Sequence, residues 1–254
     1  MDLGELTGTV LVFGGPYGNL AATRAMRDTA DRLSIAAGHV ICTGDTVAYC
    51  TEPVETIATI RDWGCHVVMG NCEEALAADA ADCGCGFLPG SSCALAAAGW
   101  YTYTRRRLSA ASRAWMGTLP RAIRFQLAGR SLMVVHGAVS VINRFVFAST
   151  PAEEKRRELD LSQADAVIAG HSGLPFGQHL GERLWLNAGV IGMPANDGTP
   201  DGWYLLLEPR GGAIRLCWQR LPYPANTSRR RMLAAGLWLL LLTALAVFSK
   251  ESGA

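Results

Sequence analysis

The sequence has no surplus of charge of either sign. Its 254 residues include 23 Lys and Arg against 22 Asp and Glu, so the formal net charge is +1. A protein that binds nucleic acid through a general basic field needs a clear excess of Lys and Arg. The composition therefore excludes that class, and we expect no specific nucleic-acid partner.

The sequence also lacks a secretory start and an internal repeat of fixed period. Residues 1–10 have neither the basic beginning nor the apolar stretch of a signal peptide, which predicts a cytoplasmic protein. In that compartment the eight cysteines are expected to be thiols rather than disulfides.

What is present is an alternation of strand and helix patterns. The apolar run "TGTVLVFGG" predicts a strand, and the helical spacing that follows, with Asn19 as cap and Gly38 as end, predicts a helix. "HVICTGD", "EPVETIATIRDWG" and "CHVVMGN" repeat the order strand, helix, strand. Such alternation predicts an α/β fold whose ligands bind at the carboxyl ends of the strands.

The rest of the chain divides by composition. Residues 73–120 are alanine-rich and predict a helical insertion, and the following segments to about residue 222 predict further strands, beginning with a pair that turns at residues 128–130. Residues 223–231 read as a linker from their Pro, Asn, Thr and Ser content.

Each of five predicted strands ends in a glycine or alanine beside a polar residue. Glycine lets the chain turn sharply, so side chains far apart in the sequence can converge in one cleft. The polar residues at four of these ends are Asp45, Asn71, His136 and His171. A carboxylate, an amide oxygen and two imidazoles are suited to Mn, Fe, Zn or Ni rather than Ca or Mg.

The order of these motifs resembles the calcineurin-like metallophosphoesterase family, in particular its small prokaryotic phosphodiesterase branch. Members read D-x-H-G-N, G-D-x-x-G, G-N-H/C-D/E, H-G and G-H-x-H. The corresponding segments here are "GPYGN", "GDTVAYCTEP", "GNCEEAL", "VVHG" and "GHSGLPF". The resemblance runs from about residue 10 to residue 218, and it implies a four-layer α/β/β/α sandwich over residues 1–222.

In this family two metal ions share one bridging aspartate. The resemblance assigns that role to Asp45 and makes Asn71, His136 and His171 ligands of the second ion. The first ion's remaining ligands fall on Gly15, Tyr17 and Gly173, so of the family's ligands for this ion only Asp45 is left. We therefore expect one divalent transition metal per chain. One bound ion can still lower the pKa of a water from ~15.7 to about 7.

Other residues of these motifs have candidate roles. Tyr17 has three candidate roles: a substitute metal ligand, a phenol that contacts the phosphate, or a packed side chain. Asn19 is expected to cap the next helix and to contact substrate, and Arg144 is a candidate phosphate contact. Cys72 falls where many relatives have a histidine that assists the leaving group.

Cys72, Cys83 and Cys85 have a further candidate role. They could together form a thiolate site that replaces the lost metal position, or they could simply be small apolar residues.

Residues 232–248 contain no charged residue and follow three arginines. This pattern favours a membrane anchor with the body in the cytoplasm, and the alternative is an apolar helix folded against the domain. The expected function is metal-dependent hydrolysis of a small phosphorylated substrate. The alternative is a non-hydrolytic member that binds a metal or a phosphorylated ligand as a sensor or partner-binding protein.

Overall fold

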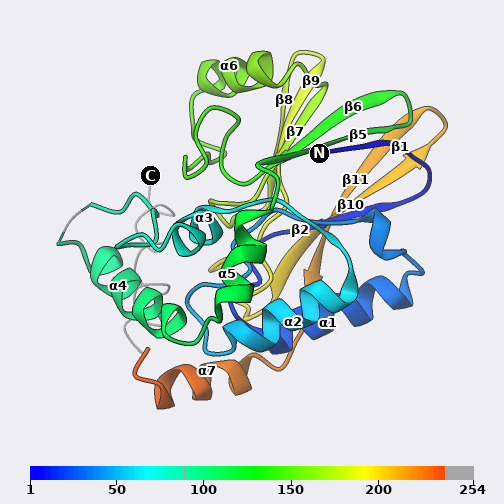
Figure 1. Ribbon diagram of the computed structural model, residues 1–254. Helices are drawn as coiled ribbons and strands as arrows, with labels where there is room; N and C mark the ends of the chain where they lie inside the picture. Colours follow the sequence, from blue (N-terminus) through cyan, green and yellow to red (C-terminus); the bar gives the residue numbers. More distant parts are fainter. Residues whose placement is uncertain (89, 238–254) are drawn as a thin grey trace.

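The computed structural model describes residues 1–88 and 90–237. Two β-sheets lie face to face, with helices on both outer sides (Figure 1). The six-stranded sheet has the order β1 (Asp2–Leu6), β5 (Ala122–Leu127), β6 (Arg130–Val135), β7 (Ala166–Ala169), β9 (Arg183–Asn187), β8 (Phe176–Leu180). The five-stranded sheet has the order β11 (Ala213–Leu221), β10 (Gly202–Arg210), β2 (Val10–Phe13), β3 (Val40–Cys42), β4 (His66–Val67).

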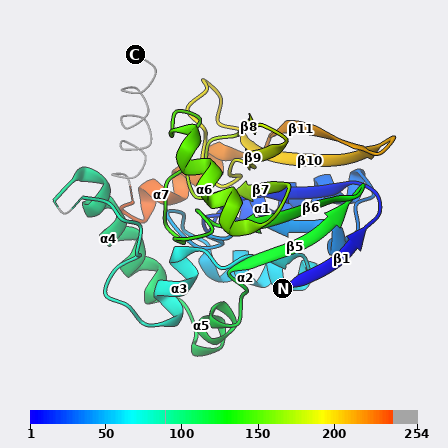
Figure 2. The ribbon, with the colours of Figure 1, turned by 90° about the horizontal axis from the view of Figure 1, so that it is seen from above.

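The helices complete the layers. Helices α1 (Leu20–Arg32) and α2 (Pro53–Trp63) cover the outer face of the five-stranded sheet, and α6 (Ala152–Ser162) covers the six-stranded one. The remaining helices gather at one end of the sandwich (Figure 2). They are α3 (Asn71–Ala77), α4 (Ser92–Arg105), α5 (Ala110–Gly117) and α7 (Ala225–Ala234), and a short 3₁₀ turn, η1 (Ala37–His39), precedes β3. The predicted four-layer α/β/β/α fold is confirmed.

Strand β2 shows why the sequence adopts this arrangement. All four of its residues are buried, as expected for a strand covered on both faces. Val10 and Val12 face the other sheet, where they meet residues such as Phe125. Leu11 and Phe13 point the opposite way and pack against α1 and α2. One apolar run therefore serves two cores.

Parallel pairing sets the position of the functional residues. Strands β2, β3 and β4 are parallel, as are β6, β7 and β9. The carboxyl ends of the strands in each set therefore lie at the same edge of its sheet. The turns that follow β3, β6 and β7 carry Asp45, His136 and His171.

The predicted linker at residues 223–231 is wrong. Residues from Ala225 onward form α7, and Met232 on this helix is only 2% exposed. Packing of one apolar side chain against the domain outweighs the local loop-like composition. The first predicted helix also ends earlier, at Arg32 instead of Gly38.

The predicted apolar segment 232–248 is described only as far as residue 237. Its first three residues end α7, and Leu237 is buried. Residues 238–248 lie outside the described part of the chain. Within the described part, no helix has both the length and the apolar character needed to cross a membrane.

Candidate metal centre

Asp45 lies on the sharp turn after β3. Gly44 has a φ of 100° and Asp45 a φ of 53°, both in the left-handed region. Such a backbone is uncommon for a non-glycine residue and needs support from its surroundings. A Cβ atom on Gly70 would overlap the Asp45 carboxylate, so this neighbour must be glycine. The turn therefore holds the carboxylate in one buried position.

Asn71 begins α3, directly beside this turn. Its Nδ2 donates to the Cys83 carbonyl at 2.9 Å. Its Oδ1 lies 3.0 Å from Nε2 of His136. The backbone N–H of Cys72 donates to Oδ1 of Asp45 at 3.2 Å, which ties the helix to the turn.

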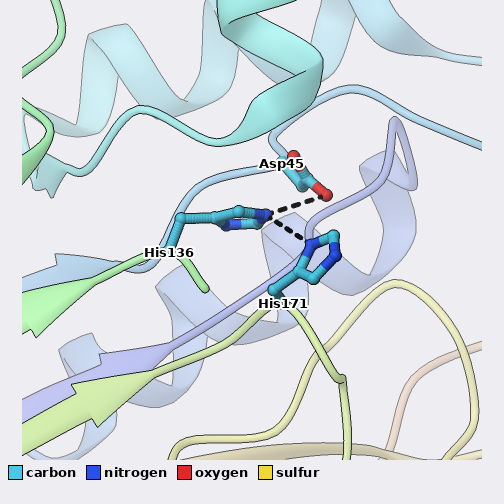
Figure 3. A group of neighbouring side chains, drawn as sticks. All are labelled: Asp45, His136 and His171. Atoms are coloured by element: carbon cyan, nitrogen blue, oxygen red, sulfur yellow. Dashed lines mark hydrogen bonds and ion pairs between the residues drawn. The ribbon is translucent and has the colours of Figure 1, made fainter. Parts of the chain in front are cut away.

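His136 and His171 follow the adjacent parallel strands β6 and β7, and in Figure 3 the His136 ring points toward both Asp45 and His171. Nε2 of His136 lies 2.9 Å from Nδ1 of His171 and 3.4 Å from Oδ2 of Asp45. Nδ1 of His136 donates to the Thr43 carbonyl at 2.8 Å, because that carbonyl can only accept. In the neutral ring that binds a metal, this bond leaves the lone pair of Nε2 facing the other groups.

These distances fit a divalent cation. Metal–ligand bonds of about 2.0–2.2 Å place neighbouring ligand atoms roughly 3 Å apart. The atoms of Asn71, His171 and Asp45 lie 2.9–3.4 Å from Nε2 of His136. Four buried ligand atoms, each with a lone pair, thus converge, and a bound cation would stabilise them better than contact with one another.

Charge interactions adjust the ionisation of the centre. Burial opposes the charge on Asp45, but His136 outweighs it and lowers the pKa of this carboxyl. Burial likewise opposes charging of His136, and Asp45 nevertheless raises its pKa above the ordinary value. Burial and the neighbouring His136 lower the pKa of His171 to about 3. His171 is therefore neutral at physiological pH and can act as a ligand.

The comparisons with known proteins agree with this arrangement. A family model for the calcineurin-like phosphoesterase superfamily domain matches residues 18–211. The chain belongs to this superfamily. No curated protein sequence matches it.

Solved structures share the phosphoesterase fold at low sequence identity. A hypothetical protein from Pyrococcus horikoshii is 15% identical with a TM-score of 0.75, over 93% of this chain and 94% of the other. A metallophosphoesterase from Sphaerobacter thermophilus is 22% identical with a TM-score of 0.72, over 95% and 99%. A cold-active protein-tyrosine phosphatase of a Shewanella species is 13% identical with a TM-score of 0.54, over 87% and 83%.

Tyr17 fills the space beside Gly15, and these are two of the three positions at which the sequence resemblance predicts lost ligands of a first ion. A Cβ on Gly15 would lie 2.5 Å from Cζ of Tyr17 and 2.7 Å from Cγ1 of Val190. The Tyr17 ring packs edge-on against Tyr49, with centroids 4.7 Å apart, and Tyr49 packs similarly against buried Trp100. Burial raises the pKa of Tyr17 well above its usual value, so the phenol stays protonated.

Asn19 acts as the predicted cap of α1, since its Oδ1 accepts from the N–H of Ala22. The same oxygen accepts from Oγ of Ser228 on α7 at 2.8 Å, and Nδ2 donates to the Gly192 carbonyl at 2.9 Å. The side chain is 1% exposed. Its polar atoms are therefore all used by the protein, and the predicted substrate contact has no support from this placement.

Arg144 is directed toward α6. Its guanidinium pairs with Glu154 at 2.9 Å and with Glu158 at 3.3 Å. The predicted phosphate contact would have to compete with these two carboxylates.

The prediction that all cysteines are thiols is wrong for one pair. Cys83 and Cys85 form a disulfide, because the turn at Gly84 brings their Cα atoms to 5.3 Å. In this form they cannot supply thiolates to the predicted three-cysteine site. Cys72 is a buried thiol whose pKa is raised well above normal by burial and by Asp45. Cys72 therefore remains protonated next to the centre.

Sequence reasoning missed the role of Glu73. This fully buried carboxylate accepts from the N–H groups of Asp45 and Thr46 at 2.8 Å and of Gly70 at 3.0 Å. It also accepts from Oγ1 of Thr46. Burial, followed by the charge of Asp45, raises the pKa of Glu73. An acid two residues after the Asn of the "GN" motif was the available signal.

Proposed function

We propose that this protein is a metal-dependent phosphoesterase with a reduced site that holds one divalent transition metal ion. Asp45, Asn71, His136 and His171 are the proposed ligands. The observation that supports them most directly is the spacing of 2.9–3.4 Å around Nε2 of His136. The substrate class is a small phosphomonoester or phosphodiester, following the superfamily.

The protein's own groups prepare this site for an ion. The Thr43 carbonyl holds the Nε2 lone pair of His136 inward, and the Cys83 carbonyl turns Oδ1 of Asn71 the same way. Asp45 supplies the negative charge, and neutral His171 supplies a second imidazole. A divalent ion in such a setting lowers the pKa of water and polarises a phosphoryl oxygen.

The packing around Gly15 and Tyr17 supports the proposed count of one ion. Tyr17 takes the room beside Gly15, and neither residue has a carboxylate or imidazole to offer. The aromatic cluster of Tyr17, Tyr49 and Trp100 is part of an apolar core, where a second cation would be costly to bury. This packing supports a single-ion site.

The same packing favours an alternative function. Without a second cation, and with Asn19 engaged by Ser228 and Gly192, fewer groups remain to hold the transferred phosphoryl. A non-hydrolytic member that binds a metal or a phosphorylated ligand, as a sensor or partner-binding protein, would meet these conditions.

One experiment separates the two functions. Full-length protein purified with Mn²⁺ is analysed for metal and then assayed on aryl phosphomonoesters and phosphodiesters. We expect close to one ion per chain, and turnover that His136→Ala reduces by at least ~100-fold, because this variant removes the central ligand. His179→Ala is the matched control, since this exposed histidine lies on β8, away from the proposed ligands.

Three results would change the proposal. Metal-loaded protein without turnover on the whole panel would favour the binding function. Two ions per chain would contradict the single-ion site. Equal loss of metal in the His136 and His179 variants would remove the ligand assignment.

A further inference from the structure

The loop at residues 82–86 contacts a proposed metal ligand through its disulfide. Nδ2 of Asn71 donates to the Cys83 carbonyl at 2.9 Å and lies 3.5 Å from Sγ of Cys85. Both cysteines are 4% exposed. The cross-linked segment therefore packs directly on the amide of Asn71.

These contacts decide which way the amide faces. An asparagine amide carries an acceptor on one side and two donors on the other, and its orientation follows from its hydrogen bonds. Because Nδ2 is engaged by the loop, Oδ1 faces Nε2 of His136 at 3.0 Å. The reversed amide would present N–H groups to a cation and lose the bond to Cys83.

The same loop reaches the other side of the centre. The Gly84 carbonyl accepts from Nδ2 of Asn143 at 2.8 Å. Two residues further on, the Phe145 ring packs on His171, with centroids 4.2 Å apart. The disulfide loop thus touches the surroundings of two of the four proposed ligands.

We propose that the Cys83–Cys85 disulfide is a redox-active positioning pair, and that its reduction by a dithiol weakens divalent-metal binding by releasing the loop that orients Asn71. This inference rests on the metal site described under the proposed function. It adds a site of thiol–disulfide exchange and a dependence of metal affinity on its redox state.

The exchange is balanced by a dithiol reductant. One of its thiolates attacks a sulfur of the disulfide and forms a mixed disulfide, and its second thiol then displaces the protein sulfur. The reductant becomes a disulfide, while Cys83 and Cys85 take up two electrons and two protons. The flanking residues Asp82 and Gly86 are exposed, while both cysteines are 4% exposed, so the reductant reaches the sulfurs when the loop opens locally.

Release of the cross-link removes the one covalent constraint within this loop and leaves it to its hydrogen bonds and packing. The loop lies outside helices and strands, and Gly84 and Gly86 have φ values of 61° and 76°. With the disulfide open, ordering the Cys83 carbonyl costs additional conformational entropy. Loss of a hydrogen-bond partner behind a metal ligand typically lowers affinity by roughly 10–100-fold.

The test compares Mn²⁺ binding by the oxidised and reduced full-length chain in calorimetric titrations. Reduced protein is prepared with dithiothreitol and desalted without oxygen. We expect two more titratable thiols after denaturation and an affinity weakened by about tenfold or more. Reoxidation with oxidised dithiothreitol should restore the affinity, which a purely structural loss would not do.

Two variants sharpen the comparison. Cys83→Ser with Cys85→Ser should bind Mn²⁺ as weakly as the reduced protein and no longer respond to dithiothreitol. Cys217→Ser is the control, because this free cysteine on β11 lies far along the chain and should leave the response unchanged.

The outcomes are distinguishable. Equal affinities of the two redox forms, or no gain of thiols on reduction, would overturn the redox inference and leave the proposed function standing. Absence of Mn²⁺ binding in both forms would overturn the metal site and this inference with it.

Discussion

At Glu73, one side chain satisfies four donors of two neighbouring turns. Its carboxylate accepts from Asp45, from both the N–H and the hydroxyl of Thr46, and from Gly70, while it is itself fully buried. These turns carry Asp45 and lead into Asn71. A buried donor that loses its acceptor costs about 1–3 kcal/mol. Glu73 therefore holds the backbone from which two proposed ligands project.

We predict that Glu73→Gln lowers the free energy of unfolding by about 2–3 kcal/mol and weakens Mn²⁺ binding, because the amide nitrogen cannot accept from the turn N–H groups. Urea unfolding and calorimetric titration measure the two effects. Glu74→Gln is the matched control. Glu74 is more exposed than Glu73 and its side chain pairs only with Arg121 among the described residues, so this substitution should change the free energy of unfolding by about 0.5 kcal/mol or less. Equal effects of the two variants would remove this role of Glu73.

Among the elements, α7 differs most from what the composition of the C-terminal region predicts. Its Ser228 binds Asn19, its Arg231 pairs with Glu52, and Met232 lies 3.8 Å from the sulfur of Cys50. The helix thus covers the start of α1. A segment with the composition of a linker is a structural part of the domain.

Truncation of Met232 tests this packing. We predict that Met232→Ala lowers the free energy of unfolding by about 2 kcal/mol or more, because it leaves a cavity in the core. Leu233→Ala is the control, as this residue is 46% exposed and its loss should cost about 0.5 kcal/mol or less. The midpoints of urea unfolding measure both. Similar midpoints for the two variants would show that α7 does not contribute as described.

For the whole molecule, the packing of Met232 and Leu237 limits what the apolar tail can do. With these two residues buried in the domain, only residues 238–248 remain of the predicted anchor. As a helix, this stretch would reach about 16 Å at ~1.5 Å per residue, against a hydrocarbon core of about 30 Å. We predict that this length does not span a bilayer while Met232 and Leu237 stay packed on the domain.

We therefore predict that the full-length chain associates with phosphatidylglycerol vesicles and that carbonate washing removes it, whereas residues 1–237 do not bind. Shallow burial of apolar side chains and attraction of Arg229 and Arg230 to the anionic surface both contribute. Vesicle flotation measures the bound fraction. Resistance to carbonate would mean that the tail spans the bilayer. A full-length chain that does not float with the vesicles would contradict membrane association.

The sequence by itself determined the fold and the proposed ligands. The apolar run of β2 and the glycines after β3, β6 and β7 are local signals, because burial and sharp turns depend on residues close together in the chain. Edge strands β1 and β8 escaped prediction, since their side chains are mostly exposed and show no apolar run. The order of the motifs was enough to indicate the superfamily.

Only the tertiary structure decided what surrounds the ligands. Tyr17 packs against Tyr49, Glu73 binds the Asp45 turn, and Ser228 binds Asn19. Each of these contacts joins segments that are distant in the chain. The disulfide loop against Asn71 is of the same kind. No local pattern encodes such contacts, because a side chain's partner is set by how the layers pack and not by its neighbours in the chain.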